Sequence, residues 1–517
     1  MIKQIFVSAI WAALLGGSLW AGDGAGTIKL GYIYLDETGN QSVNHGTFNE
    51  YEGAALSLDK FSYTFNNGMQ SRLDLKRISL NNRDLRGSLT KHGLFGLEIT
   101  NNQYRRFYDF NGNTFTRRAQ TGAALWVKPN KCVTVSAGGN GIGYRGETAD
   151  LFDPVLPTAP TKVDYDQVSY NGGIRFNKNG RMFQARYEHA DFSDNYNSAR
   201  DQSRFAVKLD GYFPVPNYEN RLILSGGFRR FESEFKAGGF GIRSNMVWGA
   251  ALANLPYNLS VKYSFLFDRT ASDSDYVATD NIINAGYVTY TWPARAAITV
   301  GYQHNINDDY FDEVKANSYY VSGWWKPASR LELRGEHGMR SEEVKAGSRL
   351  TGDQDFGRFR LTVKYRGEEI KFAKISYEGT RRENDQIGSD INFDRLGLDL
   401  SADLKGYADL SGGYSYSTGE YKNREENFEF RDHMIYCDLT AREYYKFTAG
   451  LGGTYYRSQR DLDVESFVLR FSGKYNLDSG YYVEARYNIH NFDDFLVRDR
   501  YYTANIVEIN ISKDISL

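Results

Sequence analysis

Apolar and polar side chains alternate along much of the chain. In RFRLTVKYRG, residues 358 to 367, the apolar positions are Phe359, Leu361, Val363 and Tyr365. The positions between them hold Arg358, Arg360, Thr362, Lys364 and Arg366. The same alternation occurs in residues 204–213, 331–337 and 466–475. Because successive side chains of a strand point to opposite faces of its sheet, these segments are predicted strands with one apolar face and one wet face that tolerates cations.

Short turn sequences interrupt this alternation at regular distances. They contain Pro, Gly and Asn, and a proline cannot lie inside a paired strand. They recur every 34 to 49 residues, at 128–131, 177–180, 214–220, 255–258, 292–295, 326–329, 366–369, 404–407, 442–446 and 476–480. Each interval between two turns therefore holds two predicted strands and one opposite loop.

The spacing predicts the fold class. Nine intervals give eighteen strands, residues 26–127 about six more and residues 481–517 two, which makes about 26. The opposite loops are more polar and vary in length, as in 145–164, 269–275, 305–314 and 381–390. This pattern is typical of outer-membrane proteins. We predict an all-β fold, a transmembrane antiparallel up-and-down β-barrel with short periplasmic turns and longer extracellular loops. The alternative, a soluble sandwich, conflicts with so many strands in one domain, because open sheets rarely exceed ~10 strands.

The N-terminus predicts secretion. Lys3 precedes an apolar run from about Ile5 to Leu15, and small residues follow up to Ala21 and Gly22. This run is shorter than the roughly 20 residues that a membrane-spanning helix needs, so residues 1–21 are a predicted signal peptide. Residues 22–517 would then form the barrel, located in the outer membrane of a Gram-negative bacterium.

Composition agrees with a membrane barrel. The chain contains 39 Tyr, 32 Phe and 51 Gly, which suit aromatic girdles and curved strands. A formal net charge of −2 argues against a general nucleic-acid binder. Since a cation facing lipid near the bilayer centre costs roughly 2 to 4 kcal/mol, we expect Leu361 and its apolar neighbours to face outer-membrane lipid and the Arg and Lys row to face a watery lumen.

Reactive and metal-binding motifs are scarce. No Cys-x-x-Cys-His occurs, so the chain is expected to attach no haem itself. A disulfide between Cys132 and Cys437 is not expected, because their parities point to opposite faces. The acidic residues Asp308, Asp309, Asp312 and Glu313, and the pair Asp273 and Asp275, could bind Ca²⁺, but solvated loops are the preferred explanation. No nucleophile signature is present, and an enzyme is not predicted.

Two N-terminal segments resemble a known family. Residues 48–65 and 71–110 contain a Tyr-x-Gly element at Tyr51 and Gly53, an Asn-Asn-Arg-Asp turn at 81–84, and glycines 93 and 96 before an aromatic strand. Together with the tail, 493–514, they resemble the MtrB/PioB family of decahaem-associated outer-membrane proteins. The resemblance implies a barrel that sheathes a multihaem c-type cytochrome for electron transfer across the outer membrane, with the haem in that partner.

Barrel width supports the same expectation. Barrels of 16 to 18 strands already leave an aqueous channel and those of 22 strands hold a plug, so about 26 strands would leave a wide hole. We therefore expect a partner in the lumen, held by inner-wall cations that meet its acidic groups or haem propionates. The candidate contact residues are Arg358, Arg360, Lys364, Arg366, Arg470 and Lys474. The alternative is a diffusion or substrate-selective porin without a cytochrome partner.

Overall fold

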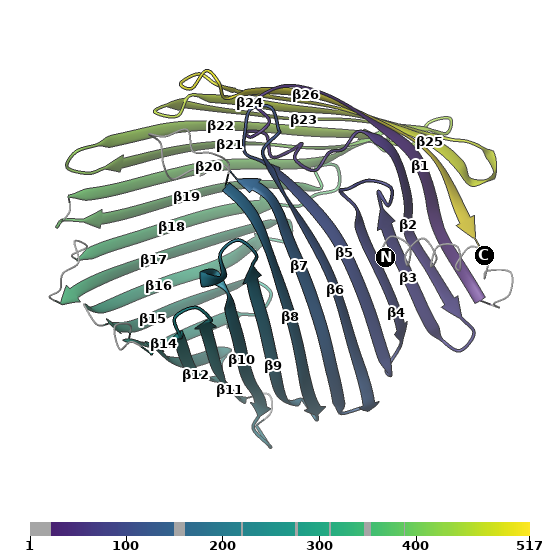
Figure 1. Ribbon diagram of the computed structural model, residues 1–517. Coiled ribbons are helices and arrows are strands. Elements are labelled where there is room, and N and C mark those ends of the chain that lie inside the picture. Colours follow the sequence, from purple (N-terminus) through teal and green to yellow (C-terminus); the bar gives the residue numbers. More distant parts are fainter. Residues whose placement is uncertain are drawn as a thin grey trace.

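A computed structural model describes residues 22–148, 161–218, 221–273, 278–309, 312–345, 353–386 and 388–516. Every strand in these ranges belongs to one antiparallel sheet (Figure 1). The predicted signal peptide lies outside them and stays a prediction. No helix in the described ranges is long and apolar enough to cross a membrane.

The strands follow one another along the chain. The first thirteen are β1 (Gly22–Gly39), β2 (Gly53–Phe65), β3 (Met69–Lys76), β4 (Asp84–Lys91), β5 (Phe95–Phe107), β6 (Phe115–Asn130), β7 (Val133–Thr148), β8 (Thr161–Lys178), β9 (Arg181–Asp194), β10 (Gln202–Pro214), β11 (Leu222–Phe235), β12 (Phe240–Leu255) and β13 (Leu259–Ser272). The others are β14 (Ala278–Trp292), β15 (Ala296–Asp309), β16 (Glu313–Ala328), β17 (Leu331–Lys345), β18 (Gln354–Tyr365), β19 (Phe372–Asn384), β20 (Ser389–Leu404), β21 (Ala408–Lys422), β22 (Asn427–Ala441), β23 (Phe447–Arg460), β24 (Val464–Asn476), β25 (Tyr481–Asp494) and β26 (Tyr501–Ser516). Two single-turn 3₁₀ helices, η1 (Ser198–Arg200) and η2 (Asp478–Gly480), lie in connections.

The sheet closes on itself. Strand β1 pairs with β26, from Ala25 opposite Ser516 to Gly39 opposite Tyr502. In Figure 1 the purple β1 lies beside the yellow β26. Closure leaves no unpaired sheet edge, which is how barrels avoid edge-to-edge aggregation. The prediction of an antiparallel barrel of about 26 strands is confirmed, and each of the ten predicted turns lies at the junction of two consecutive strands, although those at 128–131, 177–180 and 326–329 begin within the preceding strand.

The opposite connections are shorter than the sequence predicted. Asp308 and Asp309 belong to β15, Glu313 begins β16, and residues 381–384 end β19. Strands there continue beyond the apolar band, where both faces are wet and the alternation is lost. On β7 and β8, for example, Arg145 forms ion pairs with Asp164 at 3.0 Å and Asp166 at 2.8 Å.

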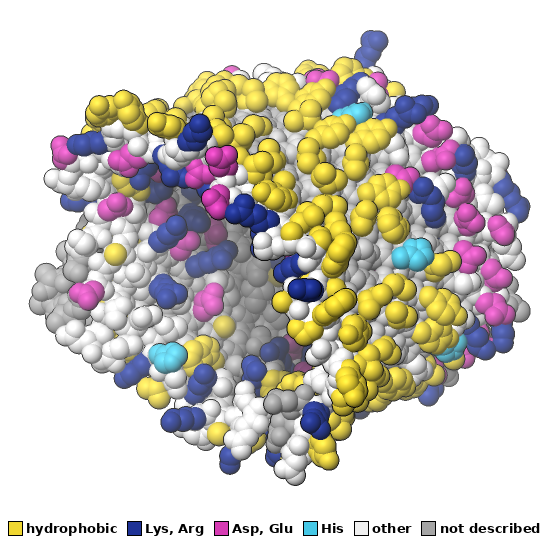
Figure 2. Space-filling view, turned by 180° about the vertical axis from the view of Figure 1, so that it is seen from behind, with side chains coloured by type: hydrophobic (Ala, Val, Ile, Leu, Met, Phe, Trp, Pro, Cys, Tyr) yellow, Lys and Arg dark blue, Asp and Glu magenta, His cyan; other side chains and the backbone are white. Residues whose placement is uncertain are grey.

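The outer wall carries an apolar band. Phe359, Leu361 and Tyr365 of β18 are large exposed hydrophobic side chains, as are Ile298 of β15 and Val321 of β16. Figure 2 shows hydrophobic side chains gathered over the outer wall and charged side chains in the hollow and along the rims. This arrangement suits a barrel surrounded by lipid.

Hydroxyl groups of outward tyrosines link neighbouring strands. Five outward tyrosines each hydrogen-bond to a polar side chain on the next strand, with distances of 2.6 to 2.9 Å. The pairs are Tyr263 with Asn284, Tyr302 with Asn317, Tyr377 with Asp394, Tyr414 with His433, and Tyr487 with Asn505. A ring with an apolar body and a polar tip is suited to the membrane–water interface.

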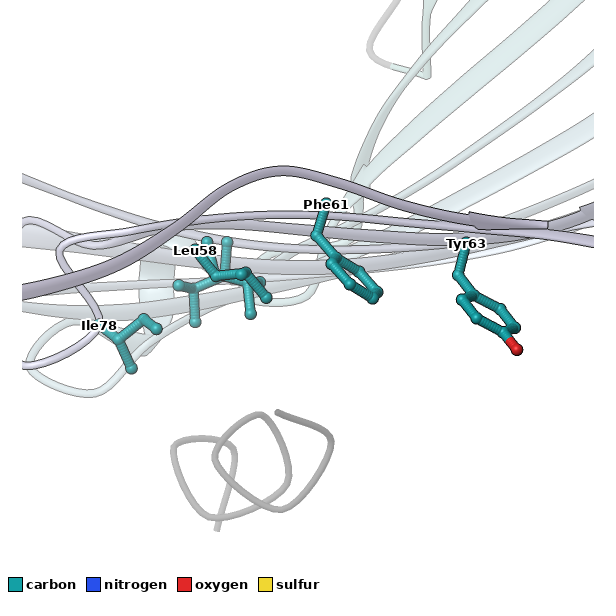
Figure 3. Close-up of a cluster of buried hydrophobic side chains, with 6 residues drawn as sticks. Leu58, Phe61, Tyr63 and Ile78 are labelled. Atoms are coloured by element: carbon teal, nitrogen blue, oxygen red, sulfur yellow. The ribbon is translucent and has the colours of Figure 1, made fainter. Parts of the chain in front are cut away.

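Strands β2 to β4 carry a buried apolar cluster. Leu58, Leu75 and Leu85 lie opposite one another across the three strands. A bulge after Leu58, where Lys60 has a φ of 49°, turns Phe61 and Tyr63 to the same side. Figure 3 shows Leu58, Phe61 and Tyr63 projecting from one side of the sheet, with Ile78 of the β3–β4 connection beside them. The cluster holds the shortest strands in register.

A folded loop closes the notch that these short strands leave between β1 and β5. We call residues 40–52 the seam loop. Its Phe48 is fully buried, and its Thr47 hydroxyl lies 2.5 Å from the Tyr502 hydroxyl of β26. From β5, Arg105 donates to the Phe48 carbonyl at 3.0 Å and to the Glu50 carbonyl at 2.9 Å. The guanidinium also lies 3.9 Å from the centre of the Tyr51 ring. Arg105 thus fastens the seam loop to the wall.

Candidate functional site

On the inner faces of β17 to β20, charged side chains of one strand lie opposite charged side chains of the next. The sheet register places Arg360 between Glu336 and Glu378, whereas Leu361 lies between Gly335 and Tyr377. The predicted parity of residues 358–365 is therefore confirmed for the two faces of β18. Charged and apolar side chains are separated across the thickness of one strand.

These inner faces line a concave part of the lumen, which we call the lumen recess. It has a volume of about 830 Å³ and receives residues from β14 to β22. Its basic side chains are Arg334, Arg360, Lys364, Lys374 and Arg395. Its acidic side chains are Glu336, Glu378 and Asp399. Five cations against three anions give the recess a positive balance.

One carboxylate in the recess pairs with two guanidinium groups. Glu378 forms ion pairs with Arg358 at 2.6 Å and Arg360 at 3.0 Å. Arg395 of β20 lies directly opposite Glu378 of β19, yet its guanidinium donates to the Ser415 hydroxyl at 3.0 Å. The positive charge around Glu378 therefore exceeds what its single carboxylate neutralises.

Two lysines face each other beside this group. Lys364 of β18 lies directly opposite Lys374 of β19. Lys374 pairs with Asp399 at 2.8 Å, and no carboxylate in the described part of the chain lies within ion-pair distance of Lys364. Glu332 of β17 lies directly opposite Lys364, but its carboxylate already pairs with Arg334, so it compensates Lys364 only in part. Like charges directly opposite in a sheet destabilise it, so the pair of lysines adds to the positive balance of the recess.

A glycine makes room for the aromatic wall of the recess. The Tyr436 hydroxyl of β22 donates to Asp399 of β20 at 2.8 Å, and its ring therefore crosses β21. At Gly413 of β21, a Cβ atom would lie 2.5 Å from the Leu398 carbonyl oxygen and 2.6 Å from the Tyr436 ring. Only glycine fits there without displacing backbone or ring.

We expect Gly413→Ala to destabilise the barrel by about 1 to 3 kcal/mol, because overpacking forces the Tyr436 ring off Asp399. The measurement is the urea midpoint of refolding into lipid vesicles. Gly338→Ala is the matched control, since a Cβ there meets nothing nearer than 3.9 Å. Equal midpoints for the two variants would refute this packing role.

The six predicted contact residues do not form one site. Arg358, Arg360 and Lys364 lie together on the inner face of β18, whereas Arg366 follows the end of that strand. Arg470 and Lys474 lie on β24, where Arg470 pairs with Asp438 at 2.8 Å across Gly452 and Lys474 lies 3.8 Å from the Tyr482 ring centre. Arg334, Lys374 and Arg395 were missed, although residues 331–337, 373–377 and 395–400 alternate just as 358–365 do.

The other predicted features lie apart from the recess. Cys132 and Cys437 are both free thiols. Within the described ranges, no three His, Cys, Asp or Glu side chains are placed to hold a metal ion, and the acidic segment 308–313 forms no such group there. Asp275 and most of the 145–164 loop lie outside the described residues.

Comparison with known proteins identifies the fold and no family. No model of a protein family matches the chain, and no curated protein matches it by sequence. The MtrB/PioB resemblance therefore stays a prediction. Among solved structures, a mutant of the ferric enterobactin receptor PfeA of Pseudomonas aeruginosa has a TM-score of 0.52 at 8% identity, covering 96% of this chain and 81% of that one.

Two further receptors of Pseudomonas aeruginosa share the fold. FpvA, solved with a pyoverdine–iron complex, has a TM-score of 0.51 at 9% identity and covers 95% of this chain and 72% of its own. The siderophore receptor PirA has a TM-score of 0.50 at 11% identity, with coverage of 83% and 80%. The fold and the apolar outer band together place this chain among outer-membrane barrels.

The expected cytochrome sheath and its multihaem partner are wrong in the light of this comparison. The solved barrels of similar fold are receptors for siderophores and not sheaths of cytochromes. The expected haem was assigned to that partner and not to this chain. The error arose because barrel width was taken to require a protein filling.

Proposed function

We propose that this protein is a transport barrel that passes a hydrophilic ligand across the outer membrane. This proposal rests on the inner wall, where charged and polar side chains line a recess with a volume of about 830 Å³. Ligand sites commonly measure about 300 to 1,000 Å³. The similarity to receptors supports transport of a specific ligand. The alternative drawn from the sequence, a diffusion or substrate-selective porin, would not need this recess as a binding site.

The wall itself is suited to keep the passage open. Inward rings lie flat over glycines of adjacent strands, as Trp126 does over Gly96 and Trp248 over Gly227. A ring that covers a glycine fills the wall without projecting into the lumen. The lumen can therefore stay wide although its wall contains large side chains.

We expect vesicles that contain the refolded protein to become permeable to hydrophilic solutes. An osmotic swelling assay with raffinose should show faster swelling than protein-free vesicles, because the solute enters through the polar lumen. Vesicles with the same mass of a 16-stranded porin serve as the size control and should admit raffinose more slowly. Vesicles that stay impermeable despite fully folded protein would contradict the proposal.

A further inference from the structure

The charges of the lumen recess point to the chemical class of the ligand. We infer that the recess binds a small anion that carries several carboxylate or phosphate groups. This inference rests on the proposed transport function and deepens it. The anion would lie between Lys364 of β18 and Arg395 of β20, neither of which forms an ion pair with a carboxylate in the described part of the chain, although Glu332 and Glu378 lie opposite them in the sheet.

The first argument is electrostatic. Lys364 and Lys374 are placed directly opposite on neighbouring strands, an arrangement that disfavours the folded sheet. Asp399 pairs with Lys374, and Glu332, opposite Lys364 on β17, already pairs with Arg334. An anion beside Lys364 would remove the repulsion, so a position that costs stability in the empty barrel becomes favourable when the ligand is bound.

The second argument concerns geometry. Glu378 is already shared by Arg358 and Arg360, and Arg395 opposite it turns to the neutral Ser415 hydroxyl. The guanidinium of Arg395 keeps donors that a carboxylate or phosphate can accept in a bidentate manner. Arg395 and Lys364 lie on either side of β19, opposite Glu378 and Lys374, which are four positions apart along that strand. A ligand with at least two anionic groups would bridge the ends of these two long side chains.

The third argument is the neutral lining. Trp324 of β16 and Tyr320 of the same strand contribute aromatic surface to the recess. Apolar surface beside a few convergent charges is the usual composition of a small-molecule site. The recess therefore offers both anchoring charges and contact area, which an evenly charged porin wall does not.

The test is a titration of the refolded barrel with citrate, a trivalent carboxylate. Binding is measured by calorimetry and by the block of single-channel current. We expect the double variant Lys364→Gln/Arg395→Gln to weaken citrate binding by about 10- to 100-fold, since each charge-assisted hydrogen bond contributes substantially. Lys262→Gln is the matched control, because Lys262 lies on the inner face of β13 outside the recess. Inorganic phosphate, titrated in parallel, separates phosphate recognition from carboxylate recognition.

Stability supplies a second readout. Citrate should raise the urea midpoint of the wild type more than that of Lys364→Gln, because a ligand that binds only the folded barrel stabilises it in proportion to its affinity, whereas a purely structural lysine would leave the citrate-dependent increase unchanged. Equal citrate affinity of the wild type, the double variant and the Lys262→Gln control would overturn the inferred ligand class. In that case, continued raffinose permeation would leave the transport function standing, and loss of permeation in the folded wild type would remove both.

Discussion

Leu361→Arg should prevent most of the protein from inserting into lipid vesicles. Leu361 lies near the middle of β18 on the outer wall and is 42% exposed, which in a membrane means contact with acyl chains. An arginine at the bilayer centre on the outer face of a barrel costs about 2 to 4 kcal/mol. The expected result is a large drop in the folded fraction, measured by the altered gel mobility of unheated samples.

The matched control for this variant is Ser376→Arg on the neighbouring strand. Ser376 lies opposite Thr362 on the inner face, one position from the level of Leu361. An arginine there extends into the lumen, and its insertion yield should remain close to that of the wild type. Equal yields for the two variants would show that the assignment of inner and outer faces is wrong.

Arg105→Ala should be the most damaging change outside the membrane band. It removes the donors to the Phe48 and Glu50 carbonyl groups and the contact with the Tyr51 ring. Buried acceptors without partners cost about 1 to 3 kcal/mol each, and a desolvated cation–π contact adds to this, so we expect a loss of about 2 to 4 kcal/mol. The measurement is the urea unfolding midpoint, together with proteolysis of the seam loop.

Arg106→Ala is the control for the seam loop. Its side chain is exposed on the other face of β5, where it stacks on Tyr108 at 5.1 Å. This variant should keep the wild-type midpoint and a protease-resistant seam loop. If Arg105→Ala leaves the seam loop equally resistant, the loop is held by its other contacts and Arg105 does not fasten it.

Local chemistry allowed most of the wall to be predicted. Turn residues and the two-residue alternation are properties of neighbouring positions, so the number of strands and the two faces of β18 follow from the sequence. Loop boundaries were less predictable. Asp308 and Asp309 belong to a strand because β15 continues beyond the membrane, where polar side chains on both faces are equally favourable.

Contacts between distant segments could not be predicted. The seam loop depends on Arg105, more than fifty positions away, and only the short strands β2 to β4 create the notch that it fills. The recess depends on the register of β17 to β22, which sets Arg395 opposite Glu378 and Lys364 opposite Lys374. Alternation identifies such residues as inward but does not give their partners. Part of the family resemblance lies at the seam loop. Tyr51 belongs to this loop, and the turn at 81–84 borders it.

The most direct test of the transport account is a cysteine block of single-channel current. In a background with Cys132→Ser and Cys437→Ser, Ser376→Cys places a thiol in the lining of the recess, and Ile375→Cys places one on the outer wall. A charged, membrane-impermeant methanethiosulfonate reagent should lower the current of Ser376→Cys in steps and leave Ile375→Cys unchanged. If the folded barrel conducts no current, or if the reagent leaves the current of labelled Ser376→Cys unchanged, the lumen is not the path for hydrophilic ligands and the account fails.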